Sequence, residues 1–239
     1  MIMSLPFYIS NFMSCFVKNQ DKRHKLRGVV NCFLYRPFIS RFIKKTFGGK
    51  VKTVKHVRQR TMGRCVCVVN DKYFVKIFRN MSGARLRNFE YLVNYIDKFI
   101  DIDIPRVYIA KNNHMYATKK AHGRSIYDFD RVDVLRNEKK ILAQVAHIIS
   151  QLQAIDLTKI KDAHRFCVAL ESTVKNPPVE PINGDSVLAH FDLNVRNFLF
   201  DEKMNICGLI DFDGMHITND RERDWQIFMK YWNRYKENN

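Results

Sequence analysis

Two short runs rich in β-branched and aromatic residues lie close together in the first third of the chain. They span residues 65–69 and 73–78, and the Asn-Asp-Lys group at 70–72, which is typical of a tight turn, separates them. This pattern predicts a β-hairpin. A further extended run with regularly placed valines, over 51–57, comes just before it and predicts a preceding strand.

Beyond the hairpin the apolar residues change to helical spacing. The new pattern predicts a helix over 84–100, followed by two more strands over 105–109 and 114–117. A longer helix is expected over 133–154, and the proline and glycine content of 173–186 predicts a loop. The order is therefore strand, strand, strand, helix, strand, strand, and then a longer helix.

Length and composition are those of a folded globular protein. The 239 residues suffice for one compact domain of one or two lobes, and are too few for two large independent domains. Hydrophobic residues make up 46% and charged residues 27% of the chain, so no long disordered stretch is expected.

The positive charge is concentrated at the N-terminus. The net charge is +17, and residues 1–60 hold 14 Lys and Arg against one acid, Asp21. An anionic partner is expected for such a segment. No zinc finger, helix-turn-helix or RNP signature accompanies the charge, so nucleic acid is not expected to be that partner.

Residues 1–47 allow two interpretations, because large apolar side chains alternate there with the basic ones. Such a segment can lie on an anionic membrane surface, or it can form amphipathic helices that pack on the protein body with a solvated basic face. Periodicity alone leaves both open. A transmembrane span is not predicted, because Pro6 and several polar residues interrupt the uncharged run 1–17, which is shorter than the roughly 20 apolar residues required. Its flanks do not resemble a secretory signal either.

The six cysteines do not form a recognisable ligand or disulfide pattern. No C-x-x-C pair or matching histidine spacing occurs, so neither a zinc site nor a disulfide framework is predicted, and buried free thiols are expected. They are Cys15, Cys32, Cys65, Cys67, Cys167 and Cys207. Cys65 and Cys67 are two apart in a predicted strand and should share one face in a core.

The candidate chemistry lies in two strings, His-Phe-Asp-Leu-Asn-Val-Arg-Asn at 190–197 and Leu-Ile-Asp-Phe-Asp at 209–213. Phosphoryl transfer needs a carboxylate that orients or accepts the proton of the attacking hydroxyl, and oxygen ligands that hold Mg²⁺ on the triphosphate. Asp192, Asn197 and Asp211 supply both. A strand, a turn and a second strand after Asn197 should bring the three side chains to one edge of a hairpin.

These strings resemble the protein-kinase-like superfamily in its small-molecule branch, which includes aminoglycoside and choline phosphotransferases. They are especially similar to the kinases that phosphorylate Kdo or heptose in the lipopolysaccharide core. The resemblance implies ATP and Mg²⁺ as cofactors, Asp192 as the catalytic base, and Asn197 and Asp211 as the Mg²⁺ ligands. It is tightest over 189–213 and extends over 51–225.

The same resemblance assigns residues upstream. Lys76 takes the position of the lysine that neutralises the ATP phosphates, although a solvated strand lysine is the alternative. Glu90 on the following helix would be its ion-pair partner, or an ordinary exposed glutamate. Lys119 and Ala121 fall in the hinge, whose backbone groups would bind adenine.

The chain also departs from the family pattern. The loop that should cover the phosphates, near 60–64, offers only Gly63, so its backbone contacts are in doubt and an arginine could replace them. Asp224 resembles the acidic position that follows the metal motif. The short C-terminal part lacks the helical substrate-binding insert of aminoglycoside or choline kinases, which weakens those two substrate classes.

Three functions follow from these observations. The first is an ATP-dependent kinase of a saccharide or glycolipid, with a lipopolysaccharide core sugar as the favoured acceptor, working on the cytoplasmic face of the inner membrane. The second is a minimal protein kinase of the secreted-effector type. The third is a pseudokinase or membrane-binding scaffold, against which the complete set of Asp192, Asn197 and Asp211 argues.

The expected architecture is an α+β, protein-kinase-like fold with two lobes. A basic amphipathic segment over 1–50 precedes a small antiparallel-sheet lobe over 51–121, and a mainly helical, abbreviated lobe over 122–239 carries the catalytic and metal loops. The sequence does not indicate an oligomeric state.

Overall fold

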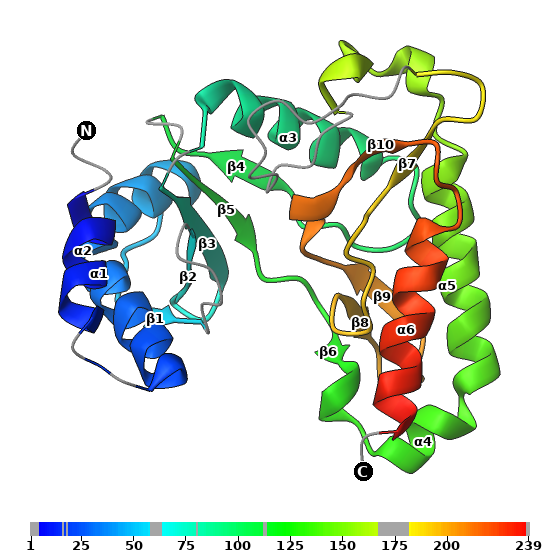
Figure 1. The fold of residues 1–239 in the computed structure, drawn as a ribbon, viewed down its shortest axis with the longest axis horizontal. Helices are drawn as coiled ribbons and strands as arrows, with labels where there is room; N and C mark the ends of the chain where they lie inside the picture. Colours follow the sequence, from blue (N-terminus) through cyan, green and yellow to red (C-terminus); the bar gives the residue numbers. More distant parts are fainter. Residues whose placement is uncertain are drawn as a thin grey trace. The chain divides into compact units, whose positions relative to one another are not determined.

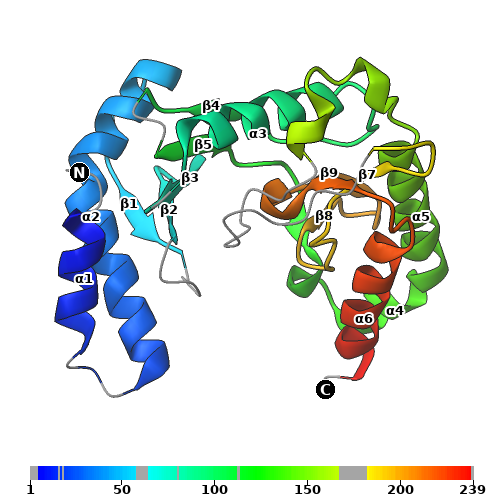
Figure 2. The ribbon, with the colours of Figure 1, turned by 45° about the horizontal axis from the view of Figure 1, so that its top comes forward.

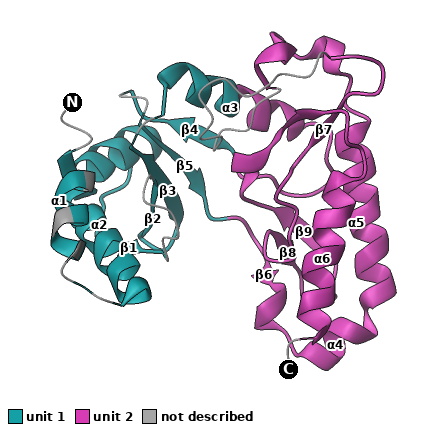
Figure 3. Ribbon diagram, in the orientation of Figure 1, with its two compact units in different colours: residues 1–90, 106–120 teal, residues 91–105, 121–239 magenta. Residues whose placement is uncertain are grey.

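The computed structural model describes residues 5–15, 17, 19–57, 64–79, 81–111, 114–166 and 182–237 (Figure 1). The chain divides into two compact units, coloured separately in Figure 3. Unit 1 contains residues 1–90 and 106–120, and unit 2 contains 91–105 and 121–239.

Unit 1 is built on an antiparallel five-stranded sheet in the order β1-β2-β3-β5-β4. Its strands are β1 (Val54–His56), β2 (Arg64–Val69), β3 (Tyr73–Phe78), β4 (Val107–Ile109) and β5 (Met115–Lys119). The predicted hairpin is β2–β3, and its turn places Asn70 and Asp71 at φ 53° and 55°, the left-handed conformation of a tight hairpin turn. Helix α3 (Gly83–Ile96) separates β3 from β4, so the predicted order of elements is confirmed.

Two helices precede the sheet. Helix α1 (Leu5–Cys15) packs along α2 (Gln20–Phe47), as Figures 1 and 2 both show. The boundaries of α2 follow capping rules: the Asn19 side chain accepts a hydrogen bond from the Lys22 backbone N at 3.0 Å, and the helix ends at Gly48 with φ 77°.

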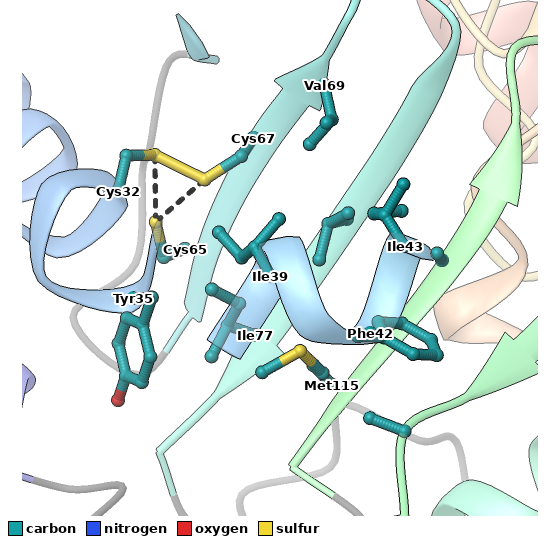
Figure 4. Close-up of a cluster of buried hydrophobic side chains, with 13 residues drawn as sticks. Cys32, Tyr35, Ile39, Phe42, Ile43, Cys65, Cys67, Val69, Ile77 and Met115 are labelled. Atoms are coloured by element: carbon teal, nitrogen blue, oxygen red, sulfur yellow. Dashed lines mark hydrogen bonds between the residues drawn. A yellow bond between two sulfur atoms is a disulfide. The ribbon is translucent and has the colours of Figure 1, made fainter. Parts of the chain in front are cut away.

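One face of α2 covers one face of the sheet (Figure 4). On β2 the burial alternates, so Cys65, Cys67 and Val69 point toward α2. The fully buried α2 residues Tyr35, Ile39 and Ile43, together with Cys32 and Phe42, pack against this face. α2 is therefore packed on the protein body, as the second interpretation of residues 1–47 expected. None of the helices in the described residues combines the length and apolar character needed to cross a membrane.

Unit 2 combines small sheets with long helices. A three-stranded sheet runs in the order β6-β8-β9, and a separate pair joins β7 to β10. The strands are β6 (Arg124–Ser125), β7 (Val187–Ala189), β8 (Phe198–Phe200), β9 (Ile206–Leu209) and β10 (His216–Thr218). The helices are α4 (Arg131–Arg136), α5 (Glu138–Gln153) and α6 (Arg223–Glu237).

Helix α6 holds the core of unit 2 together. Trp232 is completely buried, stacks on Phe228, and donates from Nε1 to Glu138 at 2.7 Å, which ties α6 to the start of α5. Phe228 in turn meets Phe198 of β8 edge to face. The strand that follows the candidate catalytic loop is thus anchored on α6.

The long helix predicted over 133–154 is in fact two helices. Asn137 has φ −94° and ψ 11°, and its side-chain amide donates to the Asp133 carbonyl at 2.8 Å. The backbone N–H of Asn137 donates to the same carbonyl at 3.2 Å, so Asn137 caps α4, and its ψ of 11° interrupts the helix before α5. The apolar periodicity continues across the break and therefore did not reveal it.

The expectation of free thiols throughout was wrong for two cysteines. Cys32 and Cys67 form a disulfide, whereas Cys65 is a buried free thiol and Cys207 a half-buried one. The pair joins α2 to β2 across 35 positions, a contact that spacing alone could not indicate. The Cys15 side chain, Cys167 and the predicted loop up to residue 181 lie outside what the structure describes.

Candidate active site

The candidate catalytic loop, residues 190–197, connects β7 to β8 within unit 2. Its second residue, Phe191, is strained, because it has φ 64°, a conformation that a bulky side chain rarely adopts. The Phe191 ring is held between His216, at a centroid distance of 3.9 Å, and Arg223, whose guanidinium lies 5.0 Å from the ring centroid. The loop is therefore fixed at its first turn by residues from β10 and α6.

Asp224 fixes the same turn through two hydrogen bonds. This carboxylate is 2% exposed, and its two oxygens accept hydrogen bonds from the backbone N–H groups of His190 at 2.8 Å and Phe191 at 2.7 Å. Bonds to an ionised acceptor are stronger than neutral ones. The sequence indicated Asp224 only through its resemblance to a family position, and gave no sign that it supports the loop.

His190 links the loop to the strand that leads to Asp211. Its ring is completely buried, with Nε2 3.1 Å from the Ile210 carbonyl oxygen, and Nδ1 accepts from the backbone N of Asp192 at 3.4 Å. Because a carbonyl can only accept, these two contacts require the neutral tautomer protonated at Nε2. His190 therefore positions Asp192 and Ile210 together.

Asp192 and Asn197 are joined directly. The side-chain amide of Asn197 donates to the Asp192 backbone carbonyl at 2.7 Å, and Asn194 donates to Asp192 Oδ1 at 3.0 Å. Asn197 is 6% exposed, whereas Asp192 is half-buried. Since the Asn197 nitrogen is used in this bond, its oxygen Oδ1 is the atom suited to a cation.

Asp211 lies two residues beyond the end of β9. The backbone N of Ile210 donates to the Asn197 carbonyl at 2.9 Å, so the segment before Asp211 is bonded to the end of the catalytic loop. Asp211 itself is left-handed, with φ 68° and ψ 54°, and opens a 3₁₀ turn over Phe212–Gly214. At Gly214 an added Cβ would lie 3.1 Å from the His190 carbonyl oxygen, so the turn approaches the loop closely. These bonds connect the backbone segments that carry Asp192, Asn197 and Asp211, whereas the meeting of their three side chains at one hairpin edge stays a prediction.

The site residues predicted in unit 1 lie on its sheet and on α3. Lys76 is on β3 between Val66 and Tyr116 of the neighbouring strands, with Nζ 5.7 Å from the Tyr116 ring centroid. Since its chain neighbours Val75 and Ile77 face α2, Lys76 projects from the opposite face of the sheet.

Glu90 on α3 accepts a hydrogen bond from the backbone N of Ile109 at 3.2 Å. Burial raises the pKa of this carboxyl, against the opposing effects of the Ile109 hydrogen bond and the Arg106 charge. This contact to β4 was not foreseen, and the ion pair of Glu90 with Lys76 stays a prediction.

The hinge and the phosphate loop complete the predicted set. Lys119 is the last residue of β5 and pairs with Tyr73, while the next backbone N–H, of Lys120, donates to Lys72 at 2.7 Å. Ala121 follows as the first residue of unit 2 after β5, so this segment connects the two units as a hinge would. Gly63 lies outside the described residues.

Several solved structures share this fold. An aminoglycoside phosphotransferase, APH(2")-IIa, in a ternary complex with streptomycin and ATP, matches with a TM-score of 0.59 at 13% identity over 84% of this chain and 82% of that one. The GDP complex of aminoglycoside 2'-phosphotransferase-IIIa matches with 0.58 at 13% identity over 82% and 78%. The macrolide 2'-phosphotransferase MphH from Brachybacterium faecium matches with 0.53 at 15% identity over 85% and 83%.

The sequence comparisons point to the same class. Residues 167–219, which include the whole candidate catalytic loop and Asp211, match the phosphotransferase enzyme family, APH. Among curated proteins no sequence matches this chain. The fold and the matched segment together define a phosphotransferase with a protein-kinase-like fold, a class of enzyme that transfers the phosphoryl group of Mg²⁺-bound ATP to a hydroxyl group. The α+β, kinase-like fold expected from the sequence is confirmed.

The donor set fits such a nucleotide complex. Asp192, Asn197 and Asp211 offer the carboxylate and amide oxygens that Mg²⁺ and an attacking hydroxyl require.

Proposed function

We propose that this protein is a saccharide kinase, which transfers the γ-phosphoryl group of ATP to a sugar hydroxyl, and that a lipopolysaccharide core sugar, Kdo or heptose, is its acceptor. The observation that carries the proposal is the bonded arrangement of Asp192 with Asn197 and of Asn197 with Ile210, held in place by the buried Asp224. Two enzymes of similar fold were solved with the sugar-containing antibiotics kanamycin and streptomycin, which supports a saccharide-like acceptor.

The residue roles follow from chemistry and position. Asp192 orients the acceptor hydroxyl and takes up its proton, because it is the half-buried carboxylate of the loop. Asn197 Oδ1 and Asp211 would hold Mg²⁺, whose charge neutralises the triphosphate. Lys76 binds the ATP phosphates, with Glu90 as its ion-pair partner.

The backbone of Lys119 and Ala121 binds adenine in this proposal. The phosphates would be covered by the loop that contains Gly63.

The test is transfer of labelled γ-phosphate from Mg-ATP by the wild type and by Asp192→Asn. Each is offered a lipopolysaccharide core acceptor and, separately, a mixed protein extract. Asp185→Asn is the matched control, because it changes an exposed carboxylate of the same unit. Label in the glycolipid that disappears with Asp192→Asn and persists with Asp185→Asn is the expected result.

Other outcomes separate the alternatives. Label that appears in protein instead, and depends on Asp192, would identify a minimal protein kinase. Label in neither fraction, together with no binding of Mg-ATP, would identify a pseudokinase or scaffold.

We further propose that the N-terminal helices dock the enzyme on the anionic cytoplasmic face of the inner membrane, where a glycolipid acceptor lies. The surface that supports this is the outer stripe of α2, defined by Lys22, Lys25, Val29, Phe33 and Arg36, which are three or four positions apart and all exposed. Phe33 is 74% and Val29 49% exposed. Exposed apolar side chains flanked by basic ones are typical of a helix that lies on an anionic membrane surface.

Helix α1 also carries exposed apolar residues. Its described side chains include four exposed apolar residues at helical spacing, Leu5, Tyr8, Ile9 and Met13. The buried face of α2 is already occupied by the sheet, so among the described side chains we expect these exposed residues to contact lipid.

Co-sedimentation with vesicles tests the docking. Binding to vesicles that contain phosphatidylserine should exceed binding to neutral vesicles and should weaken with salt. Phe33→Ser should reduce it, whereas Val132→Ser, which changes a 63% exposed valine of unit 2, should not. Equal sedimentation of wild type and Phe33→Ser would leave α2 with a purely structural role.

A further inference from the structure

Three cysteines meet in the core of unit 1 (Figure 4). Cys32 comes from α2, and Cys65 and Cys67 come from the same face of β2. All three are buried, with 4%, 0% and 0% of their surface exposed. The Cys65 sulfur lies 3.6 Å from that of Cys32 and 3.7 Å from that of Cys67, while Cys32 and Cys67 are bonded to each other.

The surroundings of the cluster are almost entirely apolar. Ile39, Ile77 and the Tyr35 ring belong to the same core, and the polar contact recorded for the Cys65 thiol beyond the two sulfurs is the Gly28 carbonyl at 3.9 Å. Burial raises the pKa of Cys65 to about 12. Reagents in solution reach such a site only when α2 moves away from the sheet.

We propose that Cys32, Cys65 and Cys67 form a redox site. The Cys32–Cys67 disulfide links α2 to β2 under oxidising conditions, and its reduction removes this link. The disulfide is the covalent connection between the N-terminal helix and the sheet. Without it, packing and weaker contacts such as the hydrogen bond from Arg36 to the Lys52 carbonyl hold α2, so the two states differ in how easily α2 can open.

The chemistry needs one small-molecule disulfide, such as oxidised glutathione. The Cys67 thiolate attacks one of its sulfurs and displaces a thiol, which leaves a mixed disulfide on Cys67. The Cys32 thiolate then attacks the Cys67 sulfur and displaces the second thiol. Two protein thiols are oxidised and one disulfide is reduced to two thiols, and an excess of thiol reverses both steps.

Cys65 remains a thiol in this arrangement. Its nearly equal distances to the two bonded sulfurs place it beside the S–S bond, whereas exchange requires approach along the bond axis. Its thiolate is also scarce, and the thiolate is the attacking species. Cys65 is nevertheless near enough to Cys32 to replace Cys67 if Cys67 is removed and the side chains rotate.

The site lies next to the strand that carries Lys76. Cys67 faces Val75 of β3, and the adjacent residue Val66 faces Lys76. The disulfide therefore acts on the face of the sheet that α2 covers, opposite the Lys76 side chain, and reduction should loosen α2 without removing any site residue. The inference does not depend on the proposed function, because its test measures thiols and the exchange of α2 amides.

The experiment uses the full-length protein equilibrated with oxidised or with reduced glutathione, then quenched with acid and alkylated after unfolding. The wild type should show two fewer alkylated cysteines in the oxidised sample. Trypsin leaves Cys65 and Cys67 on one peptide, 65–72, because no Lys or Arg separates them. The expected cross-link joins this peptide to the one that contains Cys32, and its fragmentation should place the bond on Cys67.

Variants make the assignment specific. Cys65→Ser should keep the cross-link, Cys67→Ser should move it to Cys65, and Cys207→Ser, which changes the half-buried thiol of unit 2, is the matched control. Hydrogen exchange within α2 should be at least tenfold slower in the oxidised than in the reduced wild type, and equally fast in both samples of Cys32→Ser.

Three results would overturn the proposal. One is six alkylated cysteines in both wild-type samples. Another is a cross-link that does not change between the two glutathione conditions. The third is one equivalent of bound zinc or copper that keeps all three thiols protected without a disulfide.

Discussion

At the level of single residues, the candidate site combines strained backbone with buried polar support. Phe191 and Asp211 both have positive φ, and such conformations cost about 1–3 kcal/mol each and persist only where the surroundings enforce them. For Phe191 the enforcing group is Asp224, whose carboxylate binds two consecutive N–H groups of the turn. Strain of this kind is found where a side chain must be presented in one orientation.

Asp224→Ala is therefore expected to destabilise the protein by about 1–3 kcal/mol, because the buried N–H of His190 and the partly buried N–H of Phe191 lose their acceptor. It should also lower phosphoryl transfer more than it lowers Mg-ATP binding, since Asp192 loses its fixed position. Urea unfolding and a comparison of kcat with KM measure the two effects. Asp220→Ala, at a nearby exposed acid, is the control, and an equal loss in both variants would contradict the role of Asp224.

His56 gives unit 1 a dependence on pH. Its ring packs so closely on Gly28 of α2 that an added Cβ there would lie 1.8 Å from Nε2, and burial lowers the pKa of the imidazole. The folded state thus prefers neutral His56. Its contribution to stability is complete above the unfolded-state pKa of about 6.5 and is lost as pH falls below that value toward the folded-state pKa.

We expect the free energy of unfolding of the wild type to fall between about pH 7 and pH 5 by more than that of His56→Gln. Denaturant titrations of both proteins at each pH measure their free energies of unfolding. The difference between the two proteins isolates His56, because the contributions of other groups cancel. His122→Gln, at an exposed histidine, should behave like the wild type. Parallel pH curves for wild type and His56→Gln would contradict the prediction.

At the level of elements, the β2–β3 hairpin is the piece most fully determined by local sequence. Its turn residue Asn70 adopts φ 53°. The Asn70 side chain also binds the segment before β1: Oδ1 accepts from the backbone N of Lys52 at 2.8 Å and of Thr53 at 3.1 Å, and Nδ2 donates to the Lys50 carbonyl at 2.7 Å. One residue thus provides both the left-handed turn and the connection to the segment that leads into β1.

Asn70→Ala should destabilise unit 1 by about 2 kcal/mol, because it loses both the hydrogen bonds and the residue type suited to positive φ. Asn70→Gly loses only the hydrogen bonds and should cost about 1 kcal/mol. Thermal unfolding of the two variants beside the wild type gives the order. If Asn70→Gly were the less stable variant, the backbone conformation would not be the limiting factor.

At the level of the whole molecule, the proposed function gives Asp192 and Asp211 different parts in phosphoryl transfer. In the proposed mechanism, Asp211 binds the metal of Mg-ATP, whereas Asp192 acts on the acceptor hydroxyl. Replacing Asp211 should therefore lower the affinity for Mg-ATP, whereas replacing Asp192 should not.

Mg-ATP at about 100 times its Kd should stabilise the wild type by roughly 2.7 kcal/mol, seen as a rise in Tm. Asp192→Asn should keep most of this rise while losing transfer. Asp211→Asn should lose most of it. Thermal shift with Mg-ATP, and with ATP plus a chelator as the control, distinguishes them, and a full rise in Asp211→Asn would remove its assignment as metal ligand.

The sequence by itself determined the elements and the local chemistry. Runs of β-branched residues predicted β2 and β3, and the turn residues between them predicted their connection, because strand and turn preferences act over a few positions. The Asp192–Asn197 spacing predicted a phosphoryl-transfer loop for the same reason, since both residues lie in one short segment. These features need no knowledge of what packs against them.

The tertiary structure decided how distant residues pair. The apolar pattern of α2 shows that one face is covered, but only the fold shows that the sheet covers it. In the same way, the Asp224 bonds to the loop across 34 and 33 positions and the Cys32–Cys67 bond across 35 depend on how the chain folds back. A sequence pattern specifies which side of an element is buried, whereas the partner is chosen by the packing of the whole unit.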